Sequence, residues 1–470
     1  MFDCICSQYL RGLARATLFI LGLLASALSH AQSLHIAPAP DWVVARPVPN
    51  PSDALGMNGE AMLLLDRQVH LHEGMHRYQR VVRQIRDANG LEIASTLSID
   101  FDPSYQQLTF HHLRILRGSQ SLDLLSPERF EFLRRETELE RSLYNGTVTA
   151  HRVLEDLRVG DVLDYSFTIS GANPVFGDRF TYYAPTGWGV PVEALYIRIS
   201  APAQRPLRLT PFNMPAPALQ REAQQTLIEY QAQHVPAYTL DSEAPSWFDP
   251  YPGFMVSDFT SWAEVVDWAL PLYRLPTPSA PDVKALAASL RRDHATPDAQ
   301  LIAALDFVQT QIRYVGIEVG EGSHRPTAPH ITLARRYGDC KDKTVLLMAL
   351  LRELGIRSDP LLVNTDRREH LDTLPPTPGA FDHVIVQVEL NGQTYWLDPT
   401  RTHERGDLHT RPASLLGRGL RVRAGETALI SAPTRSAPAQ PSVHVQQQLT
   451  LAPVVDHTAE MSVQTLYRGL

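Results

Sequence analysis

The sequence has 470 residues, which is longer than one typical domain and long enough for two or three, each with its own core. An apolar content of 44% and a charged content of 20% are typical of globular proteins and exclude a mainly disordered chain. The net charge of −8 and the lack of a basic cluster in the sequence argue against nucleic acid as a partner.

The first 31 residues are predicted to be a secretory signal peptide. Arg11 and Arg15 precede an apolar run over 16–29, and small residues at 29–31 suit a cleavage site. The apolar run is too short to span a bilayer comfortably, and no later run in the sequence would do so. We therefore expect no membrane span and an exported protein, in the periplasm or outside the cell.

Cleavage there would leave Cys340 as the single cysteine of the exported chain, because Cys4 and Cys6 lie before the apolar run. Cysteines of exported proteins normally pair as disulfides. A cysteine without a partner in its own chain requires another explanation, such as a reactive thiol.

Residues 32–233 are predicted to form a β-rich, sandwich-like domain. The segments 106–118 and 160–170 are rich in β-branched and aromatic residues that partly alternate with polar ones. Turn signals at 88–90 and 145–146 separate such runs. Many short strands joined by turns favour a sandwich.

The segment HEGMH, from His72 to His76, has the spacing of a zinc-protease motif, in which a helix places two histidines on one face. Gly74 lies inside the motif, and the residues before it alternate as in a strand. No further zinc ligand is evident in the sequence. We favour a strand that turns at Gly74, with a zinc peptidase as a minor alternative, and we expect no metal or organic cofactor.

A proline-rich linker is predicted over 234–281. It contains one short helix, which Ser261 and Glu264 would begin as a capping box.

A second domain is predicted over 282–430, with an early helix that has Thr296 as its N-cap and Pro297 as its first residue. The residues 431–470 include an alternating run at 442–451 and are expected to begin a further β-rich segment that is incomplete.

A long helix is predicted to begin at Cys340. Asp339 suits the N-cap, Asp342 adds an acidic group to the first turn, and the apolar run 345–351 continues toward Gly355. A helix that is apolar on all sides is buried, whereas its polar first turn should lie at the edge of the core.

The position of Cys340 favours a reactive thiolate over a small buried apolar residue. The positive end of the helix dipole and the ammonium groups of Lys341 and Lys343 both stabilise a thiolate. These are two of the three lysines in the chain. We expect them to be solvated charges of the first turn and assign neither a catalytic role.

A hairpin supplies a candidate base and a group to orient it. Asn391 and Gly392, between two alternating runs, predict a two-residue type I′ turn. Counting back from that turn places His383 and Asp398 on one face, about 7 Å apart between β-carbons, and a slip of one residue would separate them. Cys340, His383 and Asp398 are thus a candidate catalytic nucleophile, base and orienting carboxylate.

Three segments, 338–356, 381–390 and 395–400, resemble the transglutaminase-like core of papain-type cysteine enzymes. The chain is also similar to a bacterial family of exported proteins in which a β-rich domain of unknown function precedes that core. The resemblance implies the same three catalytic residues and makes Tyr314 a weaker candidate for the oxyanion hole.

The predicted fold is therefore α+β, a β-rich N-terminal domain followed by a transglutaminase-like, papain-type core. We expect thiol-dependent acyl transfer at amide carbonyls of a peptide or protein, ending in hydrolysis or in transfer to a primary amine. The alternative is a catalytically inactive binding or scaffolding module for a peptide or glycan. The natural substrate and the oligomeric state are left open.

Overall fold

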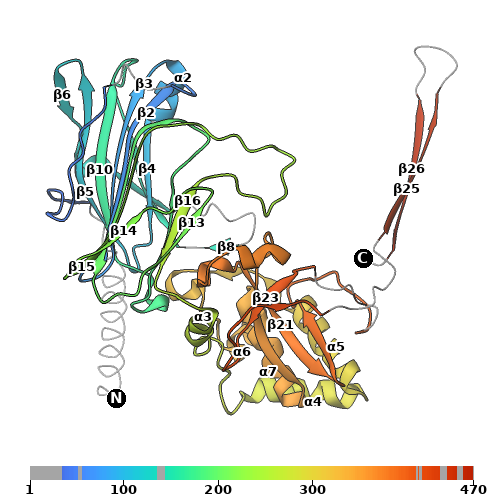
Figure 1. Ribbon diagram of the computed structural model, residues 1–470. Helices are drawn as coiled ribbons and strands as arrows, with labels where there is room; N and C mark the ends of the chain where they lie inside the picture. The colour runs from blue at the N-terminus through green and yellow to red at the C-terminus, as the bar shows by residue number, and fades with distance from the viewer. Residues whose placement is uncertain are drawn as a thin grey trace, which may run out of the picture.

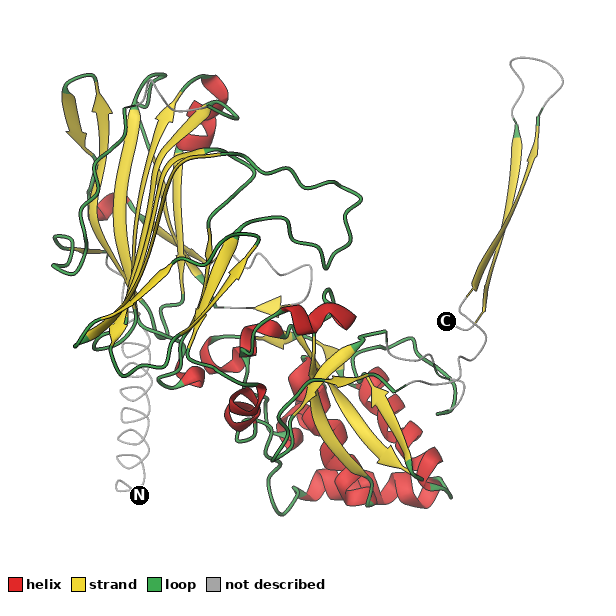
Figure 2. Ribbon diagram, in the orientation of Figure 1, coloured by secondary structure: helices red, strands yellow, loops and turns green. Residues whose placement is uncertain are grey.

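The computed structural model describes residues 34–50, 56–134, 143–144, 146–408, 411, 415–433, 442–451 and 459–468. The predicted signal peptide, with Cys4 and Cys6, lies outside these residues. A β-rich domain comes first, and a domain of helices packed on a sheet lies beside it (Figures 1 and 2). We call them the β domain (β1 to β16) and the core domain (α4 to β24). The predicted α+β order of the two domains is confirmed.

A nine-stranded sheet is the main layer of the β domain. The two segments predicted as strands are β5 and β10, which pair with each other in antiparallel. The pairs β1–β5 and β2–β12 are parallel. In spatial order, with β6 (Gln120–Asp123) beside β5, the strands are β1 (His35–Ile36), β5 (Gln107–Arg117), β10 (Val162–Ser170), β3 (His76–Ile85), β2 (Glu60–His70), β12 (Val192–Pro202), β15 (Gln225–Val235) and β14 (Ala218–Arg221).

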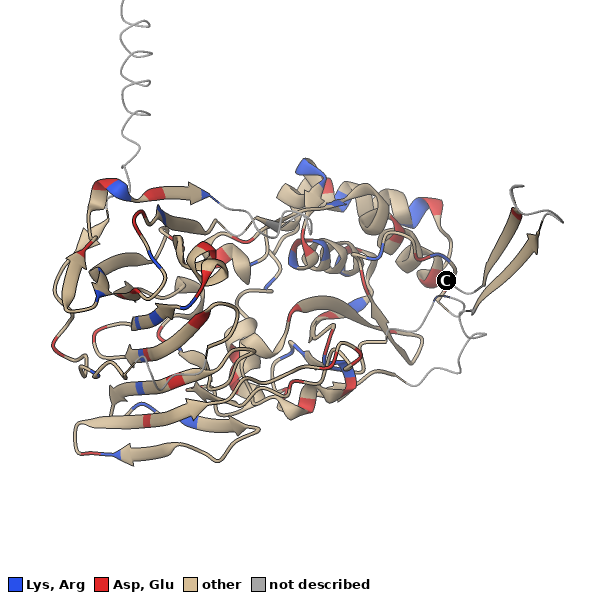
Figure 3. Cartoon of the chain, turned by 90° about the horizontal axis from the view of Figure 1, so that it is seen from above, with Lys and Arg blue, Asp and Glu red and all other residues tan. Residues whose placement is uncertain are grey.

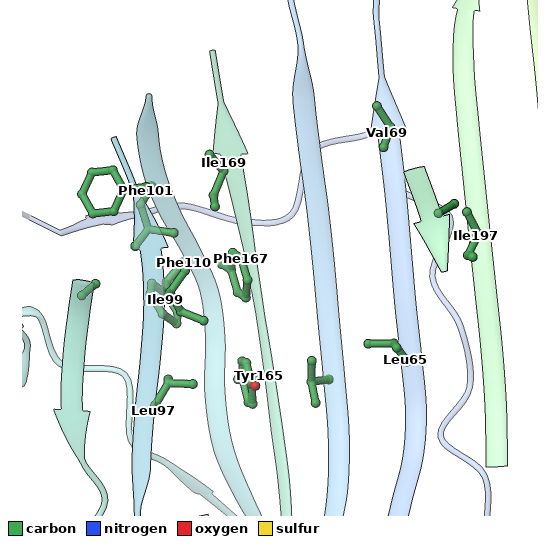
Figure 4. Packing of buried hydrophobic residues seen from close by; sticks show 14 of the residues in the cluster. Leu65, Val69, Leu97, Ile99, Phe101, Phe110, Tyr165, Phe167, Ile169 and Ile197 are labelled. Carbon is green, nitrogen blue, oxygen red and sulfur yellow. The ribbon is translucent and has the colours of Figure 1, made fainter. Parts of the chain in front are cut away.

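Two three-stranded sheets share one buried apolar core with the large sheet, as expected for a sandwich. Alternate residues of β4, namely Leu97, Ile99 and Phe101, are buried, which is the period of a strand with one face in a core. They lie opposite Phe110 and Phe167 of the large sheet (Figure 4). The strands of these sheets are β4 (Thr96–Phe101), β9 (Val148–Val153), β7 (Glu131–Arg134), β11 (Thr181–Pro185), β16 (Gly253–Ser257) and β13 (Arg208–Phe212).

Two local predictions in the β domain have different outcomes. The segment 88–90 is not a turn but the start of helix α2 (Ala88–Ala94), because the side chain of Asp87 accepts hydrogen bonds from two backbone N–H groups and caps the helix. The HEGMH segment joins β2 to β3, and Gly74 has a φ of +118°, which glycine tolerates best. The predicted strand that turns at Gly74 is confirmed, and the helix that a zinc protease requires is not formed.

The segment 234–281, predicted to be a linker, contains a strand of the β domain. This strand, β16, pairs with β11 and β13. The proline-rich residues on either side of β16 hid this strand from the sequence analysis. Helix α3 of the same segment (Trp262–Ala269) has Ser261 as the N-cap, as predicted.

The core domain packs helices against a five-stranded sheet. Helix α7 lies among the others and contacts two strands of the sheet, so that four of its leucines are fully buried. The helices are α4 (Pro281–Asp293), α5 (Pro297–Gln311), α6 (Pro329–Arg335) and α7 (Cys340–Leu354). The strands in spatial order are β22 (Gln393–Leu397), β21 (His383–Leu390), β20 (Arg357–Val363), β23 (Arg418–Arg421) and β24 (Ile430–Ser431).

Several short elements join these layers. They are β8 (Leu143–Tyr144), β17 (Arg313–Tyr314), β18 (Gly316–Ile317), β19 (Tyr337–Gly338) and the 3₁₀ turns η2 (Pro127–Arg129), η4 (Pro174–Phe176), η5 (Gly320–Ser323), η6 (Arg368–Thr373) and η7 (Pro378–Ala380).

The predicted strand at 442–451 is confirmed as β25 (Ser442–Thr450), which pairs with β26 (Glu460–Arg468) in a ribbon that projects away from the core domain (Figure 1). Basic and acidic residues are interspersed over the elements (Figure 3). None of the helices formed by the described residues has the length and apolar composition needed to cross a lipid bilayer.

Candidate functional site

Helix α7 begins at Cys340, as its capping residues predict. The side chain of Asp339 accepts hydrogen bonds from the backbone N–H groups of Lys341 (2.9 Å) and Asp342 (3.1 Å), and Asp342 completes the capping box by accepting from the N–H of Asp339. The helix ends before Gly355, whose φ of +81° suits glycine. The sulfur of Cys340 therefore lies at the positive end of a 15-residue helix.

The expectation that Lys341 is a solvated charge is wrong. Its side chain is 5% exposed, and its ammonium group lies 2.5 Å from Asp339 and 3.3 Å from Glu318. Burial opposes the charge, but these carboxylates and the adjacent sulfur raise the pKa of Lys341. A buried charge is tolerated here because the segment before the helix supplies its partners.

Lys343 is also buried, with 1% of its surface exposed. Its ammonium group donates to the backbone carbonyl of Ile312 at 2.7 Å, with Gln309 at 3.5 Å, so it binds the C-terminal end of α5. Burial lowers the pKa of Lys343 to about 8, against an opposing effect of Asp398. The expectation of a solvated first-turn charge is wrong for this lysine as well.

The predicted register of the hairpin is confirmed. Leu390 pairs with Gln393 across Asn391 and Gly392, which both have positive φ, as a type I′ turn requires. Nε2 of His383 lies 3.0 Å from Oδ2 of Asp398.

Asp398 is held in place on its other side by Thr400. The backbone N–H and the hydroxyl of Thr400 donate to Oδ1 of Asp398 at 2.8 and 2.7 Å. The side chains of Asp398 and His383 are 12% and 13% exposed. Burial would raise the pKa of Asp398, but the hydrogen bonds from His383 and Thr400 lower it below its usual range.

The imidazole of His383 connects Asp398 to the sulfur of Cys340. His383 is the first residue of β21, and the hydroxyl of Thr344 in α7 donates to the carbonyl of the next residue, Val384, at 3.2 Å. Burial alone would lower the pKa of His383, but hydrogen bonds to Asp398 and Cys340 raise it well above its ordinary value. Because Nε2 is engaged by Asp398, Nδ1 is the ring nitrogen left for the thiol.

Cys340 itself is more buried than its position suggested. It is 8% exposed and belongs to an apolar cluster that includes Val345 and Tyr273. The prediction that the first turn of α7 lies at the edge of the core is therefore corrected, because the end of α5, Glu318 and α6 contact that turn. The sulfur nevertheless remains close enough to His383 to raise the pKa of its imidazole.

A cleft of about 470 Å³ opens beside His383 and Asp398. Tyr314, the weaker candidate from the sequence, lies in its wall, and burial together with the negative charge of Cys340 raises the pKa of its phenol. Arg368 and Arg401 line the same cleft. Sequence reasoning missed both, because no local pattern distinguishes them in an arginine-rich chain.

The segment that follows Tyr314 is held by the β domain. Strand β18 pairs in parallel with β8. Nδ2 of Asn173 donates to the carbonyl of Gly320 at 2.8 Å and to the hydroxyl of Ser323 at 3.0 Å, and Asp102 accepts from the N–H of Gly320 at 3.3 Å. The wall of the cleft is thus anchored to a domain that contributes no residue to the His383–Asp398 pair.

The described residues contain no group of three or more His, Cys, Asp or Glu side chains placed to hold a metal ion. His72 and His76 lie in and beside the turn after β2, where His76 bonds to the hydroxyl of Ser170 at 2.9 Å.

A buried helix with cysteine as its first residue, beside a hairpin that carries histidine and aspartate, defines the class of papain-type, transglutaminase-like folds. Residues 284–398 match the Transglutaminase-like superfamily, and residues 73–239 match DUF3857, a domain family of unknown function with a solved structure. The chain is a transglutaminase-like protein with an N-terminal β-rich domain. No curated protein sequence matches it.

One solved structure shares the fold of most of this chain. A "putative protease" from Parabacteroides distasonis superposes with a TM-score of 0.65 at 14% identity, over 85% of this chain and 79% of that one. A "putative cysteine protease" from Cytophaga hutchinsonii (TM-score 0.25, 12% identity, 62% and 88% covered) and the periplasmic domain of TgpA from Pseudomonas aeruginosa (0.21, 15%, 62% and 90%) also match. At these identities and scores, the first match shows a shared fold and the other two add nothing to the argument.

Proposed function

We propose that this protein catalyses thiol-dependent acyl transfer at amide carbonyls of a peptide or protein, and that residues 282–430 are its catalytic domain. The observation that supports this proposal most is the position of His383, whose imidazole lies 3.0 Å from Asp398 and whose pKa is raised by both Asp398 and Cys340. A nucleophile, a base and a group that orients the base are the minimum set for this chemistry.

The proposed reaction begins from a thiolate–imidazolium pair of Cys340 and His383. The sulfur attacks the carbonyl carbon, and the backbone N–H of Cys340, one of the first N–H groups of α7 that have no acceptor within the helix, binds the oxyanion. His383 then donates its proton to the leaving amine as the C–N bond breaks. Asp398 fixes the orientation of the ring and stabilises the imidazolium throughout.

The thioester on Cys340 is then resolved by water, giving a peptidase or amidase, or by a primary amine, giving a crosslink. We favour hydrolysis, or transfer within a narrow set of envelope partners. This preference rests on the predicted export of the chain and on its transglutaminase-like fold.

The rate of alkylation of Cys340 by iodoacetamide tests the ion pair directly. Mass spectrometry of the peptide that contains Cys340 separates it from Cys4 and Cys6. We expect fast labelling at about pH 5.5, which His383→Ala abolishes and which His330→Ala, at an exposed position on α6, leaves unchanged. Slow labelling with the pH profile of an ordinary thiol would favour the binding or scaffolding module. Turnover of amide substrates, compared with Cys340→Ala, then measures catalysis.

A further inference from the structure

The cleft beside His383 holds one cationic group without an anionic partner, the guanidinium of Arg368. Arg401, in the same cleft, is paired with Glu404 at 3.1 Å. Among the described residues, the guanidinium of Arg368 makes one hydrogen bond, from Nε to the carbonyl of Thr365 at 2.9 Å, and no carboxylate of these residues lies within ion-pair distance of it. Neither terminal nitrogen has a partner in the part of the chain that the structure describes, and a guanidinium matches a carboxylate in a bidentate geometry.

The loop that carries Arg368 is hydrogen-bonded to the residues just before His383. The loop follows β20, and Asp382, the residue before His383, accepts hydrogen bonds from the N–H and the hydroxyl of Thr365, both at 2.8 Å. Nδ2 of Asn364 donates to the carbonyl of Ala380 at 2.9 Å. The loop and the start of β21 thus form one unit, so the backbone that carries Arg368 keeps a fixed position relative to His383.

The backbone at Arg368 is strained, with a φ of +48°, a region that residues other than glycine rarely occupy. The backbone here is closely packed against Gly417, because a β-carbon added to Gly417 would lie 2.3 Å from the nitrogen of Glu369 and 2.7 Å from the carbonyl carbon of Arg368. Such strain persists only where the surrounding structure enforces it, and it is concentrated at functional sites.

We propose that Arg368 binds a carboxylate of the substrate and thereby selects peptides that carry one close to the scissile amide. The carboxylate belongs to an acidic side chain or to the C-terminus of the peptide, since both present the same group. Asp382 also lines the cleft, but its carboxylate is engaged by Thr365. The inference rests on the proposed function, because it assigns specificity to the cleft beside His383 and Asp398.

Two alkylating agents that differ in charge test the proposal without requiring turnover. Iodoacetate carries a carboxylate and iodoacetamide does not, so the ratio of their rates at Cys340, relative to the ratio for glutathione, reports attraction of a carboxylate into the cleft. We expect Arg368→Gln to lower this ratio roughly three- to tenfold, the effect of one charge a few ångströms away at the surface of a protein. Arg368→Lys should retain most of the ratio, and Arg401→Gln, which removes a paired guanidinium, should change it less than twofold.

The outcomes separate this inference from the proposed function. Fast labelling of Cys340 with an unchanged ratio in Arg368→Gln would overturn the role of Arg368 and leave the proposed function standing. Slow labelling of the unmodified protein by both reagents would overturn both. Folding of each variant is checked by its unfolding transition in urea.

A protection experiment shows whether the bound carboxylate comes from a side chain or from the C-terminus of a peptide. It measures how far added peptides slow the alkylation of Cys340 by iodoacetamide. Three N-acetylated peptides of equal length are compared: one with an internal glutamate and an amidated C-terminus, one with glutamine and a free C-terminus, and one with glutamine and an amidated C-terminus. Stronger protection by the first or the second, lost in Arg368→Gln, identifies the side chain or the C-terminus as the source. Equal protection by all three would contradict the proposal.

Discussion

At the scale of single residues, the pair His383–Asp398 has opposing pKa shifts that depend on each other. The pKa of His383 is raised and the pKa of Asp398 is lowered, in both cases against the effect of burial. A raised histidine pKa contributes stability that is complete below about pH 6.5, the unfolded value, and is lost as the pH rises through the folded value. A lowered aspartate pKa contributes stability above about pH 3.9, which is lost on acidification. The two contributions overlap in mildly acidic solution.

Asp398→Asn is expected to weaken the protein most in that window. The amide keeps a hydrogen-bonding partner for the ring but removes the charge that holds the imidazolium, so we expect a loss of about 1–3 kcal/mol in the free energy of unfolding at pH 5.5 and a smaller loss at pH 9. The fast alkylation of Cys340 should also begin at a higher pH than in the unmodified chain, because a weaker imidazolium partner stabilises the thiolate less. Urea denaturation at the two pH values measures the first effect, with Asp372→Asn, at a surface ion pair, as the control. An equal loss at both pH values would show that the charge of Asp398 is unimportant.

Lys343 gives a prediction of opposite sign. Its pKa is lowered to about 8, so between pH 8 and about 10.5 the unfolded chain binds more protons than the folded chain, and stability rises with pH. The difference in free energy of unfolding between the unmodified chain and Lys343→Met should therefore increase by on the order of 2–3 kcal/mol over this range. Lys284→Met, at an exposed lysine, is the matched control and should show a flat difference. A flat difference for both variants would contradict the assigned burial of Lys343.

At the scale of elements, the first turn of α7 combines capping with a buried ion pair. Asp339 caps the helix through two backbone N–H groups and also pairs with the ammonium group of Lys341. Asparagine is an equally good N-cap but carries no charge, and alanine provides neither contact.

We therefore expect a graded loss of stability in two variants of Asp339. Asp339→Asn should cost about 2–4 kcal/mol, because it leaves the buried Lys341 with only the more distant Glu318, and Asp339→Ala should cost about 1 kcal/mol more for the lost cap. Denaturation in guanidinium chloride measures both. Equal losses in the two variants would show that the cap contributes little to stability. A negligible loss in Asp339→Asn would show that the ion pair with Lys341 contributes little.

The elements show which features a sequence can predict. The start of α7 at Cys340 and the register of the β21–β22 hairpin follow from local rules, because capping residues and a two-residue turn act within a few positions. The burial of Lys341 and Lys343 does not, because their partners, Glu318 and the end of α5, are distant in sequence. For the same reason Arg368 was missed: its position beside His383 results from packing of the loop after β20.

At the scale of the whole molecule, the β domain supports the wall of the cleft. Asn173 is one of its contacts, since its Nδ2 donates to Gly320 and Ser323 while its Oδ1 accepts from the N–H of Val175. The contact crosses from η4 of the β domain to η5 in the segment after Tyr314. Local order in that segment should therefore depend on the β domain.

Asn173→Asp separates the contact between domains from the local one, because aspartate still accepts from Val175 but no longer donates to Gly320. We expect faster limited proteolysis within residues 315–324 and slower alkylation of Cys340, with an unfolding midpoint that changes little. Asn213→Asp, at an exposed loop of the β domain, is the control. Unchanged proteolysis would mean that β18 and Asp102 hold the segment without Asn173.

The scarcity of lysine has a consequence for self-modification. Of the three lysines, two are enclosed at the start of α7, so Lys284 is the one side-chain amine that the surface offers, beside the α-amino group. If the acyl group on Cys340 were transferred to amines, few amines on neighbouring copies of this chain could accept it. Crosslinking of the protein to itself would therefore be rare. Amine-directed dyes and supports should likewise attach almost entirely through Lys284 and the N-terminus.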